Sequence, residues 1–542
     1  MREDLLRRTT AGDICGFRGT NGSNVWMGVP YASPPVGRLR WRAPLPPAPW
    51  HGIRKARDPA SPSAQASTQR IDGAIKTTYV GSEDCLYLNI WAPPNAGPGS
   101  GLPVMVWIHG GGNVAGQAHT FDSGVLATTQ EVVVVTVGYR LGLMGWFTHP
   151  ALRATAMTPE DASGNYGTLD LIESLRWVKG NIREFGGDPE LVTVFGESAG
   201  GSNVYSLLLS PLAAGLFQRA IAQSGMCDMA TEAEAENYVD EDEPGMPRSS
   251  GELMLELLVQ DGSERDRTAA KKRIAGSDSG TLAAYLRSKS YVELAEALTA
   301  IRERLGRAGP YPQLFRDGTV LPASAPLEVL AAGRYNLVPA ILGSTRDEFS
   351  ILLPIYDGSF DFIRPAGEGV FELTDADRFE KAVTCLSTLL RAKGVDEPAA
   401  VMARWSPVYA YRFDWDELRP APWLGGAQLG ATHGLDIPFV FGHSKLGAEF
   451  FQLPLLDADS DSFHNLAAAV MSYWTEFAAS GSPGRGRRGE LPEWTAWDQV
   501  MILDNEHRPT LLPHEPDPQV DATTLELAKL MRLLPERRTA RT

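Results

Sequence analysis

Short apolar runs rich in β-branched residues recur along the chain and are separated by longer stretches compatible with helices. The runs that fit buried strands lie at residues 104–109, 131–137, 191–195, 338–343 and 407–413. Continuous apolar runs of this length are typical of strands covered on both faces, and their alternation with helices is typical of a parallel sheet. The pattern therefore predicts an α/β fold, with a mostly parallel central sheet and helices on both faces.

The length of the chain leaves its division into domains open at first. With 542 residues it could form two or three domains, although α/β enzymes of this size often grow by inserting loops into one core. The 43% of hydrophobic residues is ample for a large buried sheet, and no internal repeat is evident. We predict a single domain over residues 1–542, with an acidic and helical insertion around 228–310.

One predicted strand runs directly into a candidate nucleophile. The run at 191–195 is followed by Gly-Glu-Ser-Ala-Gly at 196–200, a G-x-S-x-G motif, and then by a helix-compatible segment. A sharp strand-to-helix turn leaves no room for side chains at the flanking positions, which explains the two glycines around Ser198. The motif alone carries little weight, so its interpretation depends on the other parts of a hydrolase site.

A glycine-rich loop upstream fits an oxyanion hole. The strand at 104–109 ends in His109 and three glycines, in the sequence VMVWIHGGGN. Alone, such a loop also fits a flexible turn. Because it precedes the nucleophile motif, it matches the lipase and esterase arrangement, in which glycine amides join the amide that follows the serine. The predicted oxyanion-hole donors are Gly111, Gly112 and Ala199.

An acid and then a histidine should follow the serine along the chain. Of the five histidines after Ser198, His433 lies in a short loop beside a glycine that lets the imidazole project. The strand at 338–343 is followed by Asp347 and Glu348, and the residues themselves do not decide between these acids. A nearby acid raises the pKa of a histidine and burial lowers it, so we expect a pKa between roughly 6 and 7.5.

Other motifs make the chain resemble the type-B carboxylesterase family, which includes bacterial carboxylesterases, liver esterases and cholinesterases. The motifs that carry the resemblance, besides the nucleophile motif, are MGVPYASPPVGRLRW (27–41), SEDCLYLNIW (82–91), GNYGTLD (164–170), FGGDP (185–189), AIAQSG (220–225), IPFVFG (437–442) and YWTEFAASGSP (473–483). The motifs lie between residues 27 and 483, and the resemblance extends over residues 12 to about 505. The resemblance implies an α/β-hydrolase fold with large loop and helical insertions.

The resemblance also assigns roles to individual residues. It implies that Glu348 is the catalytic acid, although Phe349 stands where the family usually has glycine. Glu197 fits either an electrostatic or a structural role, and Ser224 matches a second serine that supports the catalytic acid. The predicted triad is therefore Ser198, Glu348 and His433.

Two further implications concern structure. By the resemblance, Arg40 should pair with Glu83 and Arg140 with Asp170, as buried ion pairs. The cysteine of secreted relatives that matches Cys85 forms a disulfide with one about twenty residues earlier, where this chain has none. All four cysteines are therefore expected to be free thiols, and no cysteine–histidine metal spacing is present. We predict neither a metal nor a cofactor.

Charge and hydropathy limit the kinds of binding partner and the cellular location that we expect. The net charge of −16 disfavours nucleic acid and anionic membranes as partners. The N-terminal residues lack the apolar core of a signal peptide, and no apolar run reaches membrane-spanning length, so a cytoplasmic location is expected. The stretch 232–243 contains seven acids and fits a solvated or disordered loop, or a flap near the active-site mouth. No feature specifies an oligomeric state.

The predicted function is hydrolysis of small carboxylic esters through an acyl-enzyme. Residues 72–82 lack the tryptophan with which cholinesterases hold a quaternary ammonium, which argues against choline esters. Trp26, Trp146 and Trp423 fit either a pocket wall or the core. The same machinery could act on amides, carbamates or polyesters. A non-catalytic binding module of the same fold is the other alternative, and the intact triad and glycine loop argue against it.

Overall fold

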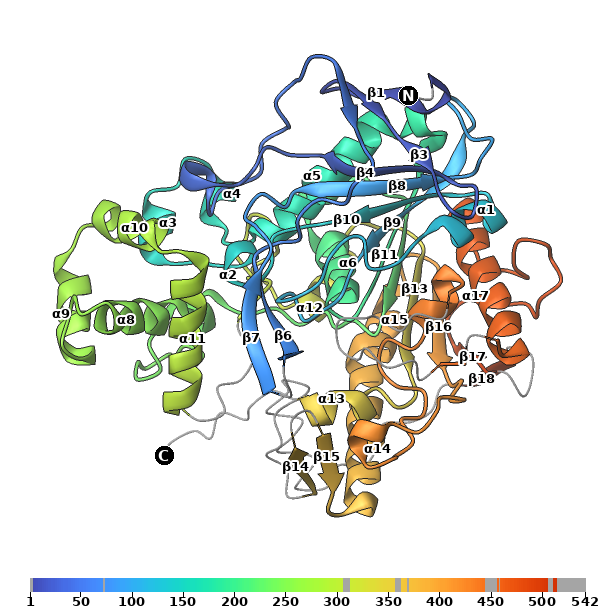
Figure 1. Ribbon diagram of the computed structural model, residues 1–542. Coiled ribbons are helices and arrows are strands. Elements are labelled where there is room, and N and C mark those ends of the chain that lie inside the picture. The colour runs from blue at the N-terminus through green and yellow to red at the C-terminus, as the bar shows by residue number, and fades with distance from the viewer. Residues whose placement is uncertain are drawn as a thin grey trace.

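The computed structural model describes residues 3–71, 74–305, 312–355, 362–367, 370–443, 456–457, 459–504 and 510–513. Within these residues the main sheet has eleven strands in the order β18-β17-β16-β13-β12-β11-β9-β10-β8-β4-β3 (Figure 1). The central strands from β10 to β17 pair in parallel, whereas β3, β4, β8 and β18 pair antiparallel to their neighbours. The predicted α/β-hydrolase fold with a mostly parallel sheet is therefore confirmed.

Each predicted apolar run forms a strand of this sheet. The predicted runs correspond to β9, β10, β11, β13 and β16. All strands of the main sheet are β3 (Phe17–Arg18), β4 (Asn24–Pro30), β8 (Tyr87–Ala92), β9 (Leu102–Ile108), β10 (Val133–Val137), β11 (Gly187–Glu197), β12 (Arg219–Gln223), β13 (Ala340–Thr345), β16 (Val408–Phe413), β17 (Gln499–Leu503) and β18 (Thr510–Pro513). The other described strands lie outside it, and they are β1 (Leu6–Arg8), β2 (Asp13–Cys15), β5 (Ile53–Lys55), β6 (Gln65–Ile71), β7 (Ala74–Val80), β14 (Ile363–Gly367) and β15 (Val370–Leu373).

Helices connect the strands and cover both faces of the sheet (Figure 1). They are α1 (Gly124–Gln130), α2 (Gly142–Gly145), α3 (Pro150–Ala154), α4 (Pro159–Ala162), α5 (Tyr166–Asn181), α6 (Ala199–Leu209), α7 (Glu232–Glu236), α8 (Ser250–Gln260), α9 (Arg267–Gly276), α10 (Ser279–Ser288), α11 (Tyr291–Leu305), α12 (Pro326–Ala331), α13 (Phe349–Ile355), α14 (Ala376–Arg391), α15 (Glu397–Met402), α16 (Ile437–Phe441) and α17 (Asp461–Ser480). Among the described helices, none is long and apolar enough to cross a membrane.

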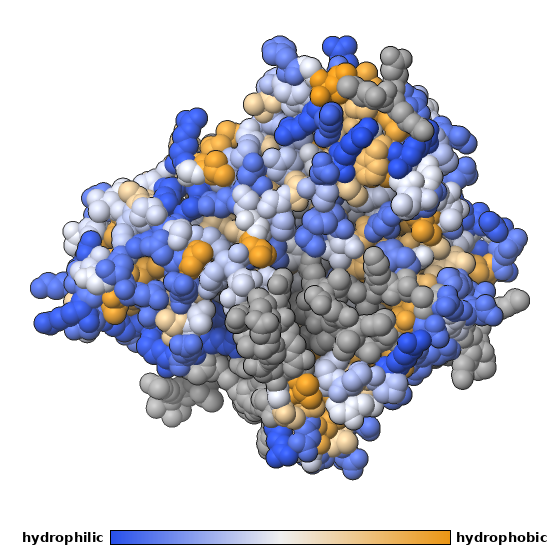
Figure 2. Space-filling model, viewed as in Figure 1, coloured by the Kyte–Doolittle hydropathy of each residue, from blue (hydrophilic) through white to orange (hydrophobic). Residues whose placement is uncertain are grey.

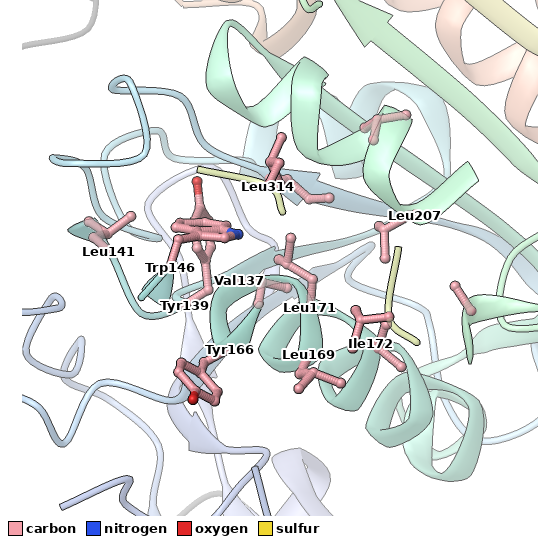
Figure 3. Close-up of a cluster of buried hydrophobic side chains, with 14 of the residues drawn as sticks. Val137, Tyr139, Leu141, Trp146, Tyr166, Leu169, Leu171, Ile172, Leu207 and Leu314 are labelled. Atoms are coloured by element: carbon pink, nitrogen blue, oxygen red, sulfur yellow. The ribbon is translucent and has the colours of Figure 1, made fainter. Parts of the chain in front are cut away.

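The core consists of two clusters, one on each face of the sheet, because successive residues of a strand point to opposite faces. In β9, Val104 and Val106 join one cluster and Met105 and Trp107 join the other. Helices α5 and α6 contribute to the first cluster, part of which is drawn in Figure 3, and α17 contributes to the second. Because side chains on both faces of the central strands are packed in these clusters, the position and direction of the strands are fixed. The loops at their carboxyl ends are positioned with them.

Helices α8 to α11 form a group beside the sheet, on the left in Figure 1, within the segment where an insertion is predicted. The acidic stretch that precedes them is folded. Glu232 and Glu236 pair with Arg153, and Asp240 pairs with Arg267 and Lys271. The expectation of a disordered loop is therefore wrong, because this stretch contains α7 and three of its acids pair with distant cations. The expectation of solvation holds for residues 240–243, which are exposed. That residues 1–542 form one domain with an inserted segment stays a prediction.

Both ion pairs implied by the resemblance are present. The guanidinium of Arg140 donates to Asp170 at 2.7 and 2.8 Å, and both side chains are buried. Arg40 pairs with Glu83 at a partly exposed position. All four cysteines lie among the described residues and are free thiols, as predicted. Burial raises the pKa of Cys85 to about 12, so this thiol stays neutral and unreactive.

On the face in Figure 2, the described hydrophobic residues are scattered among hydrophilic ones and form no single large patch.

Trp26 and Trp146 are fully buried, and Trp423 is almost so. Of the two roles left open for these tryptophans, the structure supports the core, and Figure 3 shows Trp146 among the buried side chains.

Candidate active site

Ser198 lies in a strained turn between β11 and α6. Its φ of 59° and ψ of −125° place it in a region that non-glycine residues rarely adopt. The turn is tight enough to need both glycines, since a Cβ on Gly196 would lie 2.6 Å from the Ile108 carbonyl oxygen. A Cβ on Gly200 would lie 2.0 Å from the same oxygen. The backbone thus has the shape of the predicted nucleophile elbow.

The glycine loop after β9 lies against this serine. An ideal Cβ built on Gly110 would be 3.0 Å from the Cβ of Ser198. Gly111 and Gly112 have φ values of 99° and 62°, which glycine adopts without strain. Within the described residues, the amide N–H groups of Gly111, Gly112 and Ala199 donate no hydrogen bond. These three amides are therefore unpaired within the described residues, and their role as an oxyanion hole stays a prediction.

The structure separates the two acids that the sequence left in competition. Oε2 of Glu348 is hydrogen-bonded to Nδ1 of His433, and Oε1 accepts the amide N–H of Thr345 at 2.8 Å. Asp347 points elsewhere, since its Oδ2 accepts the amide N–H of Ala431 at 2.9 Å and contacts Arg346 at 2.8 Å. Glu348 is fully buried. Glu348 therefore orients the imidazole, whereas Asp347 holds the backbone of the loop that precedes His433.

Phe349 does not disturb this arrangement. It begins α13, is 3% exposed, and its amide N–H donates to the Oγ of Ser387 at 3.2 Å. The departure from the family's usual glycine is therefore accommodated in the second core cluster.

Two more carboxyl groups surround His433. Oε1 of Glu197 lies 3.2 Å from Nε2 of the imidazole and has no hydrogen-bond partner among the described residues. Asp436, which the sequence analysis did not single out, accepts from the side chains of Gln223 at 2.8 Å and Tyr411 at 2.6 Å. Its only signal in the sequence is its position three residues after His433, directly before the motif at 437–442. The histidine thus lies among three buried carboxyl groups.

This surrounding shifts the ionisation of the site. Burial lowers the pKa of His433, but the negative charges of Glu197 and Glu348 outweigh it and raise the pKa to about 9. Burial raises the pKa of Glu197 to about 8, helped by the charges of Asp436 and Glu348 and opposed by His433. The value for His433 lies above the range expected from the sequence, because that expectation counted only Glu348 and burial.

Ser224 lies at the carboxyl end of β12, one strand away from Ser198. It is buried with a φ of 49°, and its amide N–H donates to the Gly343 carbonyl at 2.7 Å. Within the described residues its Oγ has no hydrogen-bond partner. The role of Ser224 in supporting the catalytic acid therefore stays a prediction.

The glycine loop, Ser198, Ser224 and Glu348 thus follow the carboxyl ends of β9, β11, β12 and β13, the usual place for a site in an open α/β sheet, and His433 reaches Glu348 from the loop between β16 and α16. Among the residues that the structure describes, no group of three or more His, Cys, Asp or Glu side chains is suited to a metal ion.

Comparisons with known proteins agree with this geometry. A sequence profile described as "Carboxylesterase family" matches residues 3–384 and 372–524. Para-nitrobenzyl esterase of Bacillus subtilis is 33% identical, with 90% of this chain and 92% of that protein covered. Carboxylesterase 3 of Pongo abelii is 34% identical, with 90% and 84% covered. A solved structure of a PNB esterase has a TM-score of 0.71 at 29% identity, covering 98% of this chain and all of the other.

Proposed function

This chain belongs to the carboxylesterase family and is a carboxylesterase, and we propose that it cleaves small-molecule esters through an acyl-enzyme on Ser198. The observation that carries the proposal is the chain of contacts from Glu348 to His433 and from His433 to Glu197, the residue before the strained Ser198, together with three unbonded amides in the glycine loop and at the start of α6. An oriented histidine, a strained serine and free donors in one site are suited to acyl transfer.

The proposed reaction has two halves. His433 takes the proton of Ser198 as Oγ attacks the ester carbonyl, and the oxyanion binds the amides of Gly111, Gly112 and Ala199. His433 then gives the proton to the leaving alcohol. In the second half, water attacks the acyl group, His433 again moves the proton, and the carboxylic acid leaves with Ser198 restored.

Glu348 has a supporting part in each half. Its hydrogen bond to Nδ1 fixes the tautomer in which Nε2 is free to accept a proton, and its charge stabilises the imidazolium that forms. Glu197, on the Nε2 side, adds a second negative charge near the same ring. Both carboxylates favour protonated His433. This helps His433 protonate the leaving alcohol, and it raises the pH at which His433 of the resting enzyme loses its proton and can act as a base.

The test is covalent labelling and turnover of Ser198→Ala. A fluorophosphonate should label the wild type, and Ser198→Ala should lose both the label and the turnover while keeping its circular dichroism spectrum. Ser288→Ala, at an exposed site on α10, is the matched control and should behave as wild type. A label that remains in Ser198→Ala and maps to another serine would reject the assignment.

The bond that is cleaved in the cell is a separate question. Two relatives are named fumonisin B1 esterase and para-nitrobenzyl esterase, so membership of the family does not by itself specify the ester. A panel of p-nitrophenyl esters, aryl amides and carbamates would decide among them. We expect the esters to be fastest, because an alcohol leaves more readily than an amine. The cytoplasmic location stays a prediction.

A further inference from the structure

The glycine loop makes a tight turn after Gly111, and this turn forms one unit. The Gly111 carbonyl accepts the amide N–H groups of Val114 and Ala115 at 3.1 and 3.0 Å. The N–H of Gly112 lies in the same plane as this carbonyl, because a peptide bond is planar. These bonds fix the direction of the Gly112 amide within the turn. They do not fix the position of the turn relative to Ser198.

A buried pair of asparagines joins this turn to the helix that follows Ser198. Nδ2 of Asn203, on α6, donates to Oδ1 of Asn113, inside the turn, at 2.8 Å. Asn203 is fully buried, and Asn113 is 2% exposed. Asn113 has a left-handed φ of 57°, which asparagine adopts more readily than most residues. In the described part of the chain, the bond between these two side chains is the only hydrogen bond from residues 111–116 to α6.

Two other hydrogen bonds of the turn lead to parts of the chain that do not carry the nucleophile. The Asn113 carbonyl accepts the amide N–H of Gly142, where α2 begins, at 2.7 Å. The Gly112 carbonyl accepts from Nε2 of Gln313 at 2.9 Å. These bonds hold the turn against its other neighbours, whereas the bond from Asn203 relates the turn to α6.

Helix α6 carries both Asn203 and one of the three proposed oxyanion donors. Ala199 is its first residue, and Asn203 follows about one helical turn later. The helix is fixed on the sheet, because its Leu207 and Leu208 side chains are fully buried in the first core cluster (Figure 3). The bond from Asn203 to the turn therefore sets the distance between the Ala199 and Gly112 amides.

We propose that Asn203 is a positioning residue, which holds the turn of the glycine loop close enough to Ser198 for its amides to bind the oxyanion. The inference rests on the proposed function, because it assumes acyl transfer at Ser198. The donors of an oxyanion hole work best when they are in place before charge develops. A looser turn therefore raises the barrier to reaction more than it weakens substrate binding. Asn203 is itself fully buried and acts through Asn113.

The experiment replaces Asn203 by leucine, which has a similar size and cannot donate a hydrogen bond. Rates are expressed per active serine, titrated with a fluorophosphonate, so that misfolded molecules do not contribute. For a p-nitrophenyl ester we expect Asn203→Leu to lower kcat about tenfold, with KM within about twofold, as for a hydrogen bond that matters in the transition state. A trifluoromethyl ketone, which forms a tetrahedral adduct with the serine, should bind about tenfold more weakly.

Asn113→Gly tests the route of this effect. Glycine keeps the left-handed backbone and removes the acceptor. If Asn203 acts through Asn113, adding Asn203→Leu to Asn113→Gly should change kcat by less than about twofold, because the bond is already absent. Losses of kcat that multiply in the double variant would reject the proposed role. If Asn203→Leu does not fold, Asn203→Ser, whose shorter side chain does not reach Asn113, takes its place.

Asn181→Leu is the matched control for the loss of a buried asparagine. Asn181 ends α5, and its side chain accepts the amide N–H of Thr10 at 2.7 Å and donates to the Trp177 carbonyl at 2.8 Å. We expect Asn181→Leu to unfold at lower urea concentration and to keep the kcat of the wild type. If Asn203→Leu has the kcat of Asn181→Leu, or raises only KM, the positioning role is rejected and the triad is unaffected. Turnover that remains in Ser198→Ala would instead reject the serine mechanism itself.

Discussion

Replacing Glu197 by glutamine should move the rise of kcat/KM with pH to lower pH. The free enzyme needs neutral His433 as its base, so kcat/KM rises as the imidazolium loses its proton. The carboxylate 3.2 Å from Nε2 favours the imidazolium and raises the pKa of His433. Glutamine keeps the size of the side chain and removes the charge. The sign is therefore fixed, because without that charge the neutral imidazole prevails from a lower pH.

The size of the shift follows from distance and burial. Two unit charges 3.2 Å apart interact by about 5 kcal/mol at an effective dielectric constant of about 20, which corresponds to roughly four pH units as an upper bound. Burial raises the pKa of Glu197 itself to about 8, so near neutral pH its charge is present only in part and the two groups titrate together. We expect the inflection to fall by about one to two pH units.

The assay is kcat/KM for a p-nitrophenyl ester in steps between pH 5 and 9.5, with rates corrected for hydrolysis without enzyme. Glu190→Gln, an exposed change in the same strand, is the matched control and should leave the inflection in place. Asp436→Asn should lower it less than Glu197→Gln, because Asp436 contributes the smaller charge effect on His433. An inflection that stays in place or rises in Glu197→Gln would refute the reasoning.

Two further changes test the site and its support. Glu348→Gln should lower kcat by roughly 10³- to 10⁴-fold, as the analogous change does in serine proteases, because the imidazole loses its orienting charge. Asp347→Asn should cost far less, and steady-state kinetics in which these effects are reversed would move the catalytic role to Asp347. Asp170→Asn should lower the free energy of unfolding by about 3–5 kcal/mol, since it leaves the buried Arg140 guanidinium without its counter-charge. Urea unfolding measures this loss, and an unchanged midpoint would contradict it.

The sheet could be predicted from the sequence because burial on both faces leaves a local signal. The run at 191–195 falls inside β11, and the run at 407–413 differs from β16 by one residue. The antiparallel strands β4 and β8 were not among the predicted runs. They carry buried polar residues such as Asn24 and Asn89, whose hydrogen bonds are made to distant parts of the chain. An apolar pattern alone does not reveal such strands.

Contacts between distant residues explain why the acidic stretch is ordered. Seven acids in twelve residues suggest a disordered loop only when their partners are unknown. Arg153 lies about eighty residues before the acids that it pairs with, and Arg267 and Lys271 follow Asp240 by about thirty. Composition counts charges along the chain, whereas the stability of a charged segment depends on which charges meet in space.

The active site shows the same division between local and spatial information. The glycines that flank Ser198 are needed by the turn itself, so a short motif is enough to locate the elbow. The choice between Asp347 and Glu348 depends on which of the two carboxyl groups reaches the imidazole of His433. The residues next to them in the sequence do not indicate this. The pKa of His433 depends on Glu197 and Asp436 as well as on Glu348. The chemistry of the nucleophile is thus encoded locally, whereas the tuning of its base arises where the ends of several strands come together.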